Sequence, residues 1–242
     1  MSAILYDTDS TFDISRFCHL LSIRISDLFP LADDAKHAEL QQASLTRLHI
    51  FRPRSLPQLA TSLKYLPSYH ASHMPDDEIG LLAIDSTSAF YWPELLYEEQ
   101  LRNFAPKKPG SKTETLDHVL NAINSIIRSH APLVLLTNWG LRVVSQDQST
   151  PTVYKQHLRP FPVLRGSDVT SADRPLELAH HISLFHLSST LHPNTGPDMC
   201  SGQDLSHGNE NSHRVVCLIT SSRGQEMSRC QLTINSDRIL LE

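Results

Sequence analysis

A chain of 242 residues with 40% hydrophobic residues is long enough for one large α/β domain or two small ones. The 26 acidic side chains outnumber the 21 basic ones and give a net charge of −5. This excludes nucleic-acid binding through the overall charge, so any such binding must come from a local basic patch. No apolar run approaches the roughly 18 to 20 residues of a membrane span, and the first residues resemble no secretory signal, so we expect an intracellular protein.

Short apolar segments alternate with helical ones along the first half of the chain. We predict strands at residues 3–6, 45–51, 79–84 and 133–137. These are nearly continuous apolar runs, which is typical of a parallel sheet that is buried on both faces. Three further strands, at residues 181–187, 215–220 and 230–234, are separated by turn-rich sequence. They are predicted to form a more antiparallel end of the sheet.

Three helices are predicted between these strands. The first carries apolar residues at helical spacing over residues 17–28 and stops at Pro30. The second is capped by Ser55, presents a leucine stripe and ends at Pro67. The third begins with the capping box Ser111-x-x-Glu114 and carries an apolar stripe that predicts a core-facing side.

Loops, cysteines and histidines complete the pattern. Residues 103–112, 145–175 and 194–213 are predicted to be long loops, the last of them disordered.

The four cysteines show no Cys-x-x-Cys spacing, so we expect reduced thiols rather than disulfides or a zinc site. The 14 histidines, among them His180, His181 and His186, lack a His-Glu-x-x-His pattern. We interpret them as parts of histidine-rich loops rather than metal ligands.

Polar residues follow three of the predicted strands. Asp7-Thr8-Asp9 follows the first, Asp85-Ser86 the third and Thr137-Asn138 the fourth. Taken alone, an apolar strand that ends in Asp indicates little, because the carboxylate can simply cap the next turn. Together, and with Thr87-Ser88-Ala89-Phe90-Tyr91-Trp92 after Ser86, the three segments resemble the core of the RecA-like recombinases, in the branch of the eukaryotic recombinase paralogues. The resemblance covers roughly residues 3–140, and residues 176–240 only by strand pattern.

This resemblance implies an α/β fold over residues 1–242 as a single domain: a RecA-like P-loop NTPase core with a mostly parallel sheet, helices on both faces and antiparallel strands at the C-terminal end. The first strand and the P-loop are missing, because Gly-x-x-x-x-Gly-Lys-[Ser/Thr] does not occur. Gly110-Ser111-Lys112-Thr113 is only a fragment of that motif and lies after the Asp85 strand. We expect an N-terminally incomplete sequence, or else a P-loop-free protein whose exposed apolar sheet edge is covered by a partner or causes aggregation.

The resemblance also assigns roles to individual residues. Asp85 corresponds to the Walker B acid that contacts the Mg²⁺ of a nucleotide, with Ser86 beside it. Asp9 falls where active recombinases place the glutamate that orients the attacking water, and Asn138 matches the polar sensor residue. The shorter Asp9, and Trp139 in place of the usual Gln, predict little or no ATP turnover. ATP and magnesium are implied as cofactors, although no Walker A motif is present to hold the phosphates. Turn capping stays open as the alternative role of Asp9 and Asn138.

In the family, DNA is contacted by loops that follow the second and third of these strands, here residues 103–112 and 145–175. The candidate phosphate contacts, preferentially with single-stranded or branched DNA, are Lys107, Lys108, Lys155, Arg159 and Arg165. The resemblance implies a nuclear protein that joins other recombinase paralogues in a heteromeric complex and supports a recombinase filament in double-strand break repair by homologous recombination. Two alternatives stay open. One is a DNA-dependent ATPase or recombinase with an upstream P-loop, and the other is an unrelated α/β scaffold whose polar strand ends need not meet.

Overall fold

A computed structural model describes residues 1–102, 114–139, 141–142, 154–155, 179–186, 213–221 and 226–241. The chain divides into two compact units, and the described residues up to 155 belong to the first and those from 179 to the second. The predicted loop 103–112, nearly all of 145–175 and nearly all of 194–213 lie outside the described residues. No helix in the described part of the chain has the length and apolar character needed to cross a membrane.

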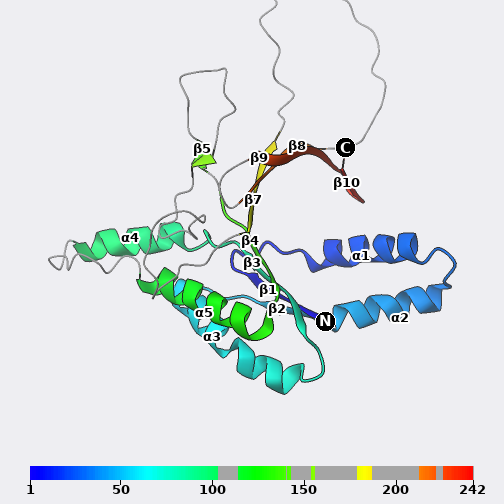
Figure 1. Cartoon of the computed structure of the whole chain (residues 1–242), viewed down its shortest axis with the longest axis horizontal. Coiled ribbons are helices and arrows are strands. Elements are labelled where there is room, and N and C mark those ends of the chain that lie inside the picture. The colour runs from blue at the N-terminus through cyan, green and yellow to red at the C-terminus, as the bar shows by residue number, and fades with distance from the viewer. Residues whose placement is uncertain are drawn as a thin grey trace, which may run out of the picture. The chain divides into compact units, whose positions relative to one another are not determined.

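The first unit is built on a four-stranded parallel sheet with the strand order β2-β1-β3-β4 (Figure 1). Its strands are β1 (Ser2–Asp7), β2 (Leu48–Phe51), β3 (Ile79–Asp85) and β4 (Leu133–Leu136). The four predicted strands and their parallel pairing are therefore confirmed. Because the strands run in the same direction, their carboxyl ends lie along one edge of the sheet. A separate two-stranded antiparallel sheet pairs β5 (Leu141–Arg142) with β6 (Tyr154–Lys155).

Five helices are described in this unit. They are α1 (Ile14–Leu28), α2 (Asp34–Leu45), α3 (Leu56–His73), α4 (Tyr91–Arg102) and α5 (Glu114–His130). The prediction that Pro67 ends its helix is wrong, because α3 continues through this proline to His73. Helices α2 and α4 were not predicted, and Leu45, predicted to begin a strand, is the last residue of α2. The α5 helix is confirmed, while Ser111 of its predicted capping box lies outside the described residues.

The core of the first unit lies between the parallel sheet and helices α3 and α5, which lie on the same side of the sheet (Figure 1). Alternate residues of β1 and β3 meet residues at helical spacing on α3 and α5, so the predicted apolar stripes of these two helices are confirmed as core-facing, whereas the stripe of α1 contributes no residue to this core. Each such side chain contributes about 1.5–3 kcal/mol by leaving water. Burial raises the pKa of Tyr6 to about 12, against a smaller opposite effect of its hydrogen bond with Ser62. The apolar members that are at most 1% exposed are Ile4, Tyr6, Leu59, Leu63, Leu66, Leu82, Ile84, Val119, Ile123 and Ile126.

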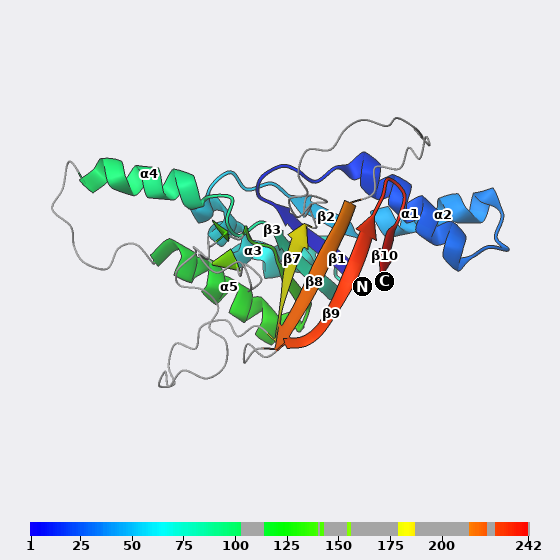
Figure 2. The ribbon, with the colours of Figure 1, turned by 90° about the horizontal axis from the view of Figure 1, so that it is seen from above.

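The second unit is a four-stranded antiparallel sheet with the order β10-β9-β8-β7 (Figure 2). Its strands are β7 (His180–His186), β8 (His213–Ser221), β9 (Glu226–Ile234) and β10 (Ile239–Leu241). The antiparallel prediction is confirmed, but the strands form a sheet of their own rather than an end of the parallel one. His180, His181 and His186 lie in β7, which confirms the strand predicted at residues 181–187 and shows that the interpretation of these histidines as loop residues is wrong. Leu184, Cys217 and Cys230 are aligned across the three strands and share one face.

Candidate functional site at the carboxyl edge of the parallel sheet

The three polar strand ends lie on neighbouring strands. Asp7 and Asp85 are paired in register at the ends of β1 and β3, and the Thr8 amide donates a hydrogen bond to the Asp85 carbonyl at 2.8 Å. On the other side of β3, the Thr137 amide donates to the Ile84 carbonyl at 3.1 Å. Segments that are distant in the sequence thus meet at one edge of the sheet, where open α/β sheets bind ligands.

The Asp85 carboxylate is held by the end of β4. The Thr137 hydroxyl donates a short hydrogen bond to Asp85 Oδ1. The amide and the hydroxyl of Thr87 both donate to the Thr137 carbonyl, each at 2.9 Å. A hydroxyl donor fixes the orientation of the carboxylate that accepts its hydrogen bond. The predicted Walker B acid is therefore a structural link between β3 and β4.

Buried hydroxyls connect the same strand ends. The Thr8 hydroxyl donates to the Ser86 carbonyl at 2.7 Å, and the Ser86 and Ser88 hydroxyls lie 3.1 Å apart. The Trp139 amide donates to the Ser88 hydroxyl at 3.0 Å. Both serines are 1% exposed. Ser86, predicted to contact a nucleotide, thus has its hydroxyl inside a network that ties β1, β3 and β4 together.

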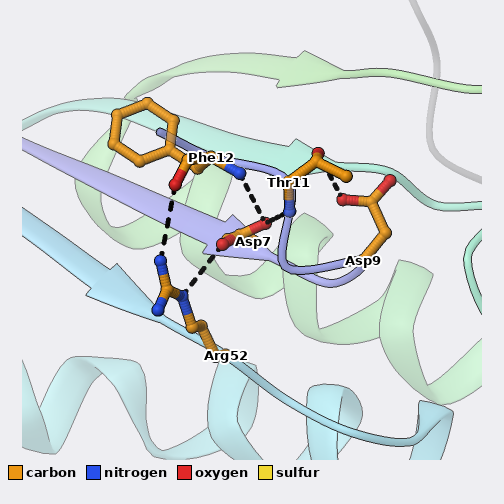
Figure 3. Close-up of polar contacts among 5 residues, drawn as sticks. All are labelled: Asp7, Asp9, Thr11, Phe12 and Arg52. Atoms are coloured by element: carbon orange, nitrogen blue, oxygen red, sulfur yellow. Dashed lines mark hydrogen bonds and ion pairs between the residues drawn. The ribbon is translucent and has the colours of Figure 1, made fainter. Parts of the chain in front are cut away.

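A second buried carboxylate lies at the end of β1 (Figure 3). The Asp7 side chain is 1% exposed, and its Oδ1 accepts the amides of Thr11 at 3.0 Å and Phe12 at 3.4 Å. Its Oδ2 accepts Arg52 Nε at 2.9 Å. Three donors, one of them charged, compensate the loss of water around this carboxylate.

Sequence reasoning missed the pairing of Asp7 with Arg52. Arg52 directly follows β2, and β2 lies beside β1 in the sheet, so the strand order brings the two together. The available signal was a single arginine after a strand, which indicates no partner until the order of the strands is known.

Asp9 and Asn138 have different surroundings. The Asp9 carboxylate accepts the Thr11 side-chain hydroxyl at 2.8 Å within its own turn (Figure 3), whereas the backbone amides of Thr11 and Phe12 are capped by Asp7, so turn capping by Asp9 stays a prediction. The Asn138 side-chain oxygen is buried and has no hydrogen-bond partner among the described residues. An amide oxygen in this state is costly, on the order of 1–3 kcal/mol.

The predicted DNA contacts fall mostly outside the described residues. Lys107, Lys108, Arg159 and Arg165 are not described, and of Lys155 the structure describes the backbone, as the last residue of β6. Lys155 is therefore in a short strand rather than in an irregular loop.

The edge suits a magnesium nucleotide only in part. A carboxylate at a strand end is a ligand that Mg²⁺ accepts, and Asp85 occupies such a position. However, the turns at residues 7–12 and 85–91 contain no glycine, and a phosphate cradle needs successive backbone N–H groups pointing inward. No group of three or more His, Cys, Asp or Glu side chains that could hold a metal ion occurs among the described residues. The described residues therefore do not fit the phosphate half of such a site.

A comparison with models of known protein families finds no match for this chain. A comparison with the sequences of curated proteins also finds none.

Proposed function

We propose that this chain is a recombinase-paralogue subunit that acts in double-strand break repair by homologous recombination. In this role it supports a recombinase filament within a heteromeric complex of paralogues in the nucleus, with little or no ATP turnover of its own. The single observation that supports this proposal best is the meeting of three polar strand ends on adjacent parallel strands, in a chain without a Walker A motif. A RecA-like core would bring the same ends to one edge.

The hydrogen bonds at the edge favour a structural role over catalysis. The Asp85 carboxylate accepts a hydrogen bond from the Thr137 hydroxyl, and the Asp9 carboxylate accepts one from the Thr11 hydroxyl in its own turn. A water-orienting group must lie within hydrogen-bond reach of the attacking water, and a displacement of about 1 Å can reduce a rate by about 10²-fold. We infer that the role of the edge in this chain is to join β1, β3 and β4. ATP and Mg²⁺ would then need phosphate-binding residues from outside the residues described here.

The proposal is tested by purifying the full chain and measuring ATP hydrolysis with and without single-stranded DNA. We expect no DNA-stimulated turnover, and the same background rate for Asp85→Ala. Turnover that Asp85→Ala abolishes would overturn the non-catalytic role. The subunit role is tested separately by co-purification of the chain with other recombinase paralogues and by the lifetime of a recombinase filament on single-stranded DNA, which the complex should lengthen.

A DNA-dependent ATPase is the second candidate. The Asn138 side-chain oxygen favours it, because this buried acceptor has no partner in the described part of the chain and a donor or cation of a bound ligand would supply one. Binding of Mg²⁺–ATP to the purified chain, measured by calorimetry and lost in Asn138→Leu, would support this candidate over the first.

A further inference from the structure

The turn between α1 and α2 exposes three large apolar side chains that lie close together in the sequence. Leu28, Phe29 and Leu31 are 56%, 48% and 100% exposed. The turn is at the end of the α1–α2 hairpin that points away from the parallel sheet, as both views of the ribbon show (Figures 1 and 2). We call these three residues the apolar tip. Single exposed apolar residues are ordinary, but a group at a projecting turn indicates an interaction site.

The turn that carries the apolar tip is held by hydrogen bonds. The Phe29 amide donates to the Ile25 carbonyl at 2.9 Å, and the Ala32 amide donates to the Phe29 carbonyl at 3.0 Å. The same Phe29 carbonyl lies 2.9 Å from His37 Nε2. Asp33 caps α2 by accepting the Lys36 amide at 2.8 Å. The tip is therefore preorganised, and its docking would lose little conformational entropy.

The two helices behind the tip are joined as well. The Gln41 side-chain amide donates to the Cys18 carbonyl at 3.2 Å, which links the middle of α2 to α1. Ile25, one turn before the tip, is buried at 5% exposure. The hydrogen bond between Gln41 and Cys18 thus links the two helices without the tip residues.

The charged side chains of the turn itself are all acidic, and the nearest cations in the sequence are Arg24 and Lys36, on the two flanking helices. Residues 26–35 contain Asp27, Asp33 and Asp34 and no Lys or Arg. The negative end of the α1 dipole and the positive end of the α2 dipole both lie at this turn and oppose each other, so the carboxylates set the sign of its charge. A membrane surface rich in anionic lipid would repel this turn. A protein pocket with Lys or Arg at its rim would attract it.

We propose that the apolar tip docks into an apolar pocket, rimmed by Lys or Arg, on a neighbouring subunit of the complex. This inference rests on the proposed function, since that function supplies the neighbour, a recombinase paralogue. Apolar anchors at the centre with charges at the rim form the usual anatomy of a protein interface. Phe29 and Leu31 are the anchors, and Asp34 is a rim charge.

The test measures the affinity of the purified full chain for each purified recombinase paralogue. We expect the double variant Phe29→Ser, Leu31→Ser to bind at least about tenfold more weakly, because two anchors lose their apolar contact. We expect Asp34→Lys to weaken binding at low salt and to have a smaller effect at high salt, because salt screens exposed charges. The matched control is Tyr65→Ser, which removes a 64% exposed aromatic side chain from α3 and should leave the affinity unchanged.

Each outcome decides the inference. A photo-crosslinking residue placed at position 31 should join the tip to an apolar, Lys- or Arg-rimmed surface of the bound paralogue. If a paralogue binds the unaltered chain and both tip variants equally well, the inference is wrong while the proposed function stands. If no paralogue binds the unaltered chain, both are wrong. If hydroxyl-radical labelling of the isolated chain already spares Phe29 and Leu31, the chain itself covers the tip and the inference is also wrong.

Discussion

At the scale of single residues, the most informative feature is a carboxylate at the end of β1. Asp7 is 1% exposed, accepts two backbone amides and is paired with Arg52 Nε at 2.9 Å. Removing the charge from such a group leaves its donors without a good acceptor. The Arg52 side chain is 55% exposed, so it can regain water when the pair is broken, whereas Asp7 cannot.

This asymmetry predicts unequal effects for the two partners. Asp7→Asn should lower the free energy of unfolding by about 2–4 kcal/mol, and Arg52→Ala by about 1–2 kcal/mol. Urea unfolding followed by circular dichroism measures both. The control is Glu39→Gln, which breaks the exposed pair of Lys36 with Glu39 at the same distance of 2.9 Å and should cost less than about 1 kcal/mol. Equal costs for Asp7→Asn and Glu39→Gln would contradict the burial of Asp7.

At the scale of elements, α3 contains two prolines in different environments. Pro57 lies in the first turn of the helix, where a missing amide costs nothing, because that amide would have no partner in the helix. Pro67 lies inside the helix. Because proline has no backbone N–H, it cannot donate the helical hydrogen bond to the Leu63 carbonyl, and its ring crowds that carbonyl.

Pro67→Ala should therefore raise the free energy of unfolding by about 1–3 kcal/mol, because it restores one helical hydrogen bond and removes a steric conflict. Pro57→Ala is the matched control and should change stability by less than about 1 kcal/mol. Thermal denaturation of the two variants checks the comparison. A loss of stability in Pro67→Ala would show that the proline fixes a bend that the fold requires.

A histidine cluster joins the C-terminal halves of α3 and α5 to β2. His49 Nδ1 lies 3.0 Å from the Tyr69 hydroxyl, and the His70 and His130 rings meet edge to face at 5.0 Å. Burial, and then the charge of His73, lowers the pKa of His49, with a smaller opposite effect of Asp77. Burial, and then the charge of His70, lowers the pKa of His130.

These shifts give the direction of a pH effect. The ordinary histidine pKa is 6.5, and the folded values lie below it, so the unfolded chain binds more protons in the interval between them. The contribution of neutral His49 and His130 to the free energy of unfolding is present above about pH 6.5. It is lost as the pH falls through the lowered pKa values of these histidines in the folded chain. Urea unfolding between about pH 7.5 and about pH 5.5 should show falling stability while carboxylates stay ionised.

The variant His49→Gln, His130→Gln should reduce that dependence on pH. His118→Gln, on the same helix as His130 but at an exposed position, is the control and should leave the dependence as it is in the unaltered chain. The interpretation fails if the unaltered chain is equally stable at both ends of the interval.

Sequence patterns revealed the elements that have an apolar face and missed those that do not. The strands around Ile4, Leu82 and Val134 were predictable because continuous apolar runs indicate burial. Helix α2 has no buried residue, so its helical form depends on residue propensity and on the Asp33 cap, which no apolar stripe marks.

The candidate site was predictable only as a set of strand ends. That parallel strands place Asp7, Asp85 and Thr137 along one edge follows from the strand pattern alone. The hydrogen bonds among these side chains do not follow from that pattern. The bond from Thr137 to Asp85 and the pairing of Asp7 with Arg52 depend on strand order and side-chain conformation. The burial of Asn138 depends on the same packing.

At the scale of the whole molecule, the charge balance constrains any contact with DNA. The net charge is −5, so the field of the molecule opposes a polyanion, and binding must come from a local group of cations. The proposed group is Lys107, Lys108, Lys155, Arg159 and Arg165. Each phosphate contact on a single strand adds about −0.7 to the slope of log K against log salt, so five contacts give a slope of at most about −3.5.

Two variants with equal net charge separate a local contact from a general charge effect. Replacing the five proposed contact cations with Ala takes the net charge from −5 to −5 − 5 = −10, and we call this the loop variant although Lys155 lies in β6. Replacing five exposed cations of the helices with Ala does the same, and these are Arg16, Arg24, Lys36, Lys64 and Arg128. Fluorescence anisotropy with single-stranded DNA at several salt concentrations should show loss of binding and of the salt slope in the loop variant, with the helix variant close to the unaltered chain. Equal losses in the two variants would mean that net charge alone governs the contact, because only a local phosphate contact distinguishes cations by their position.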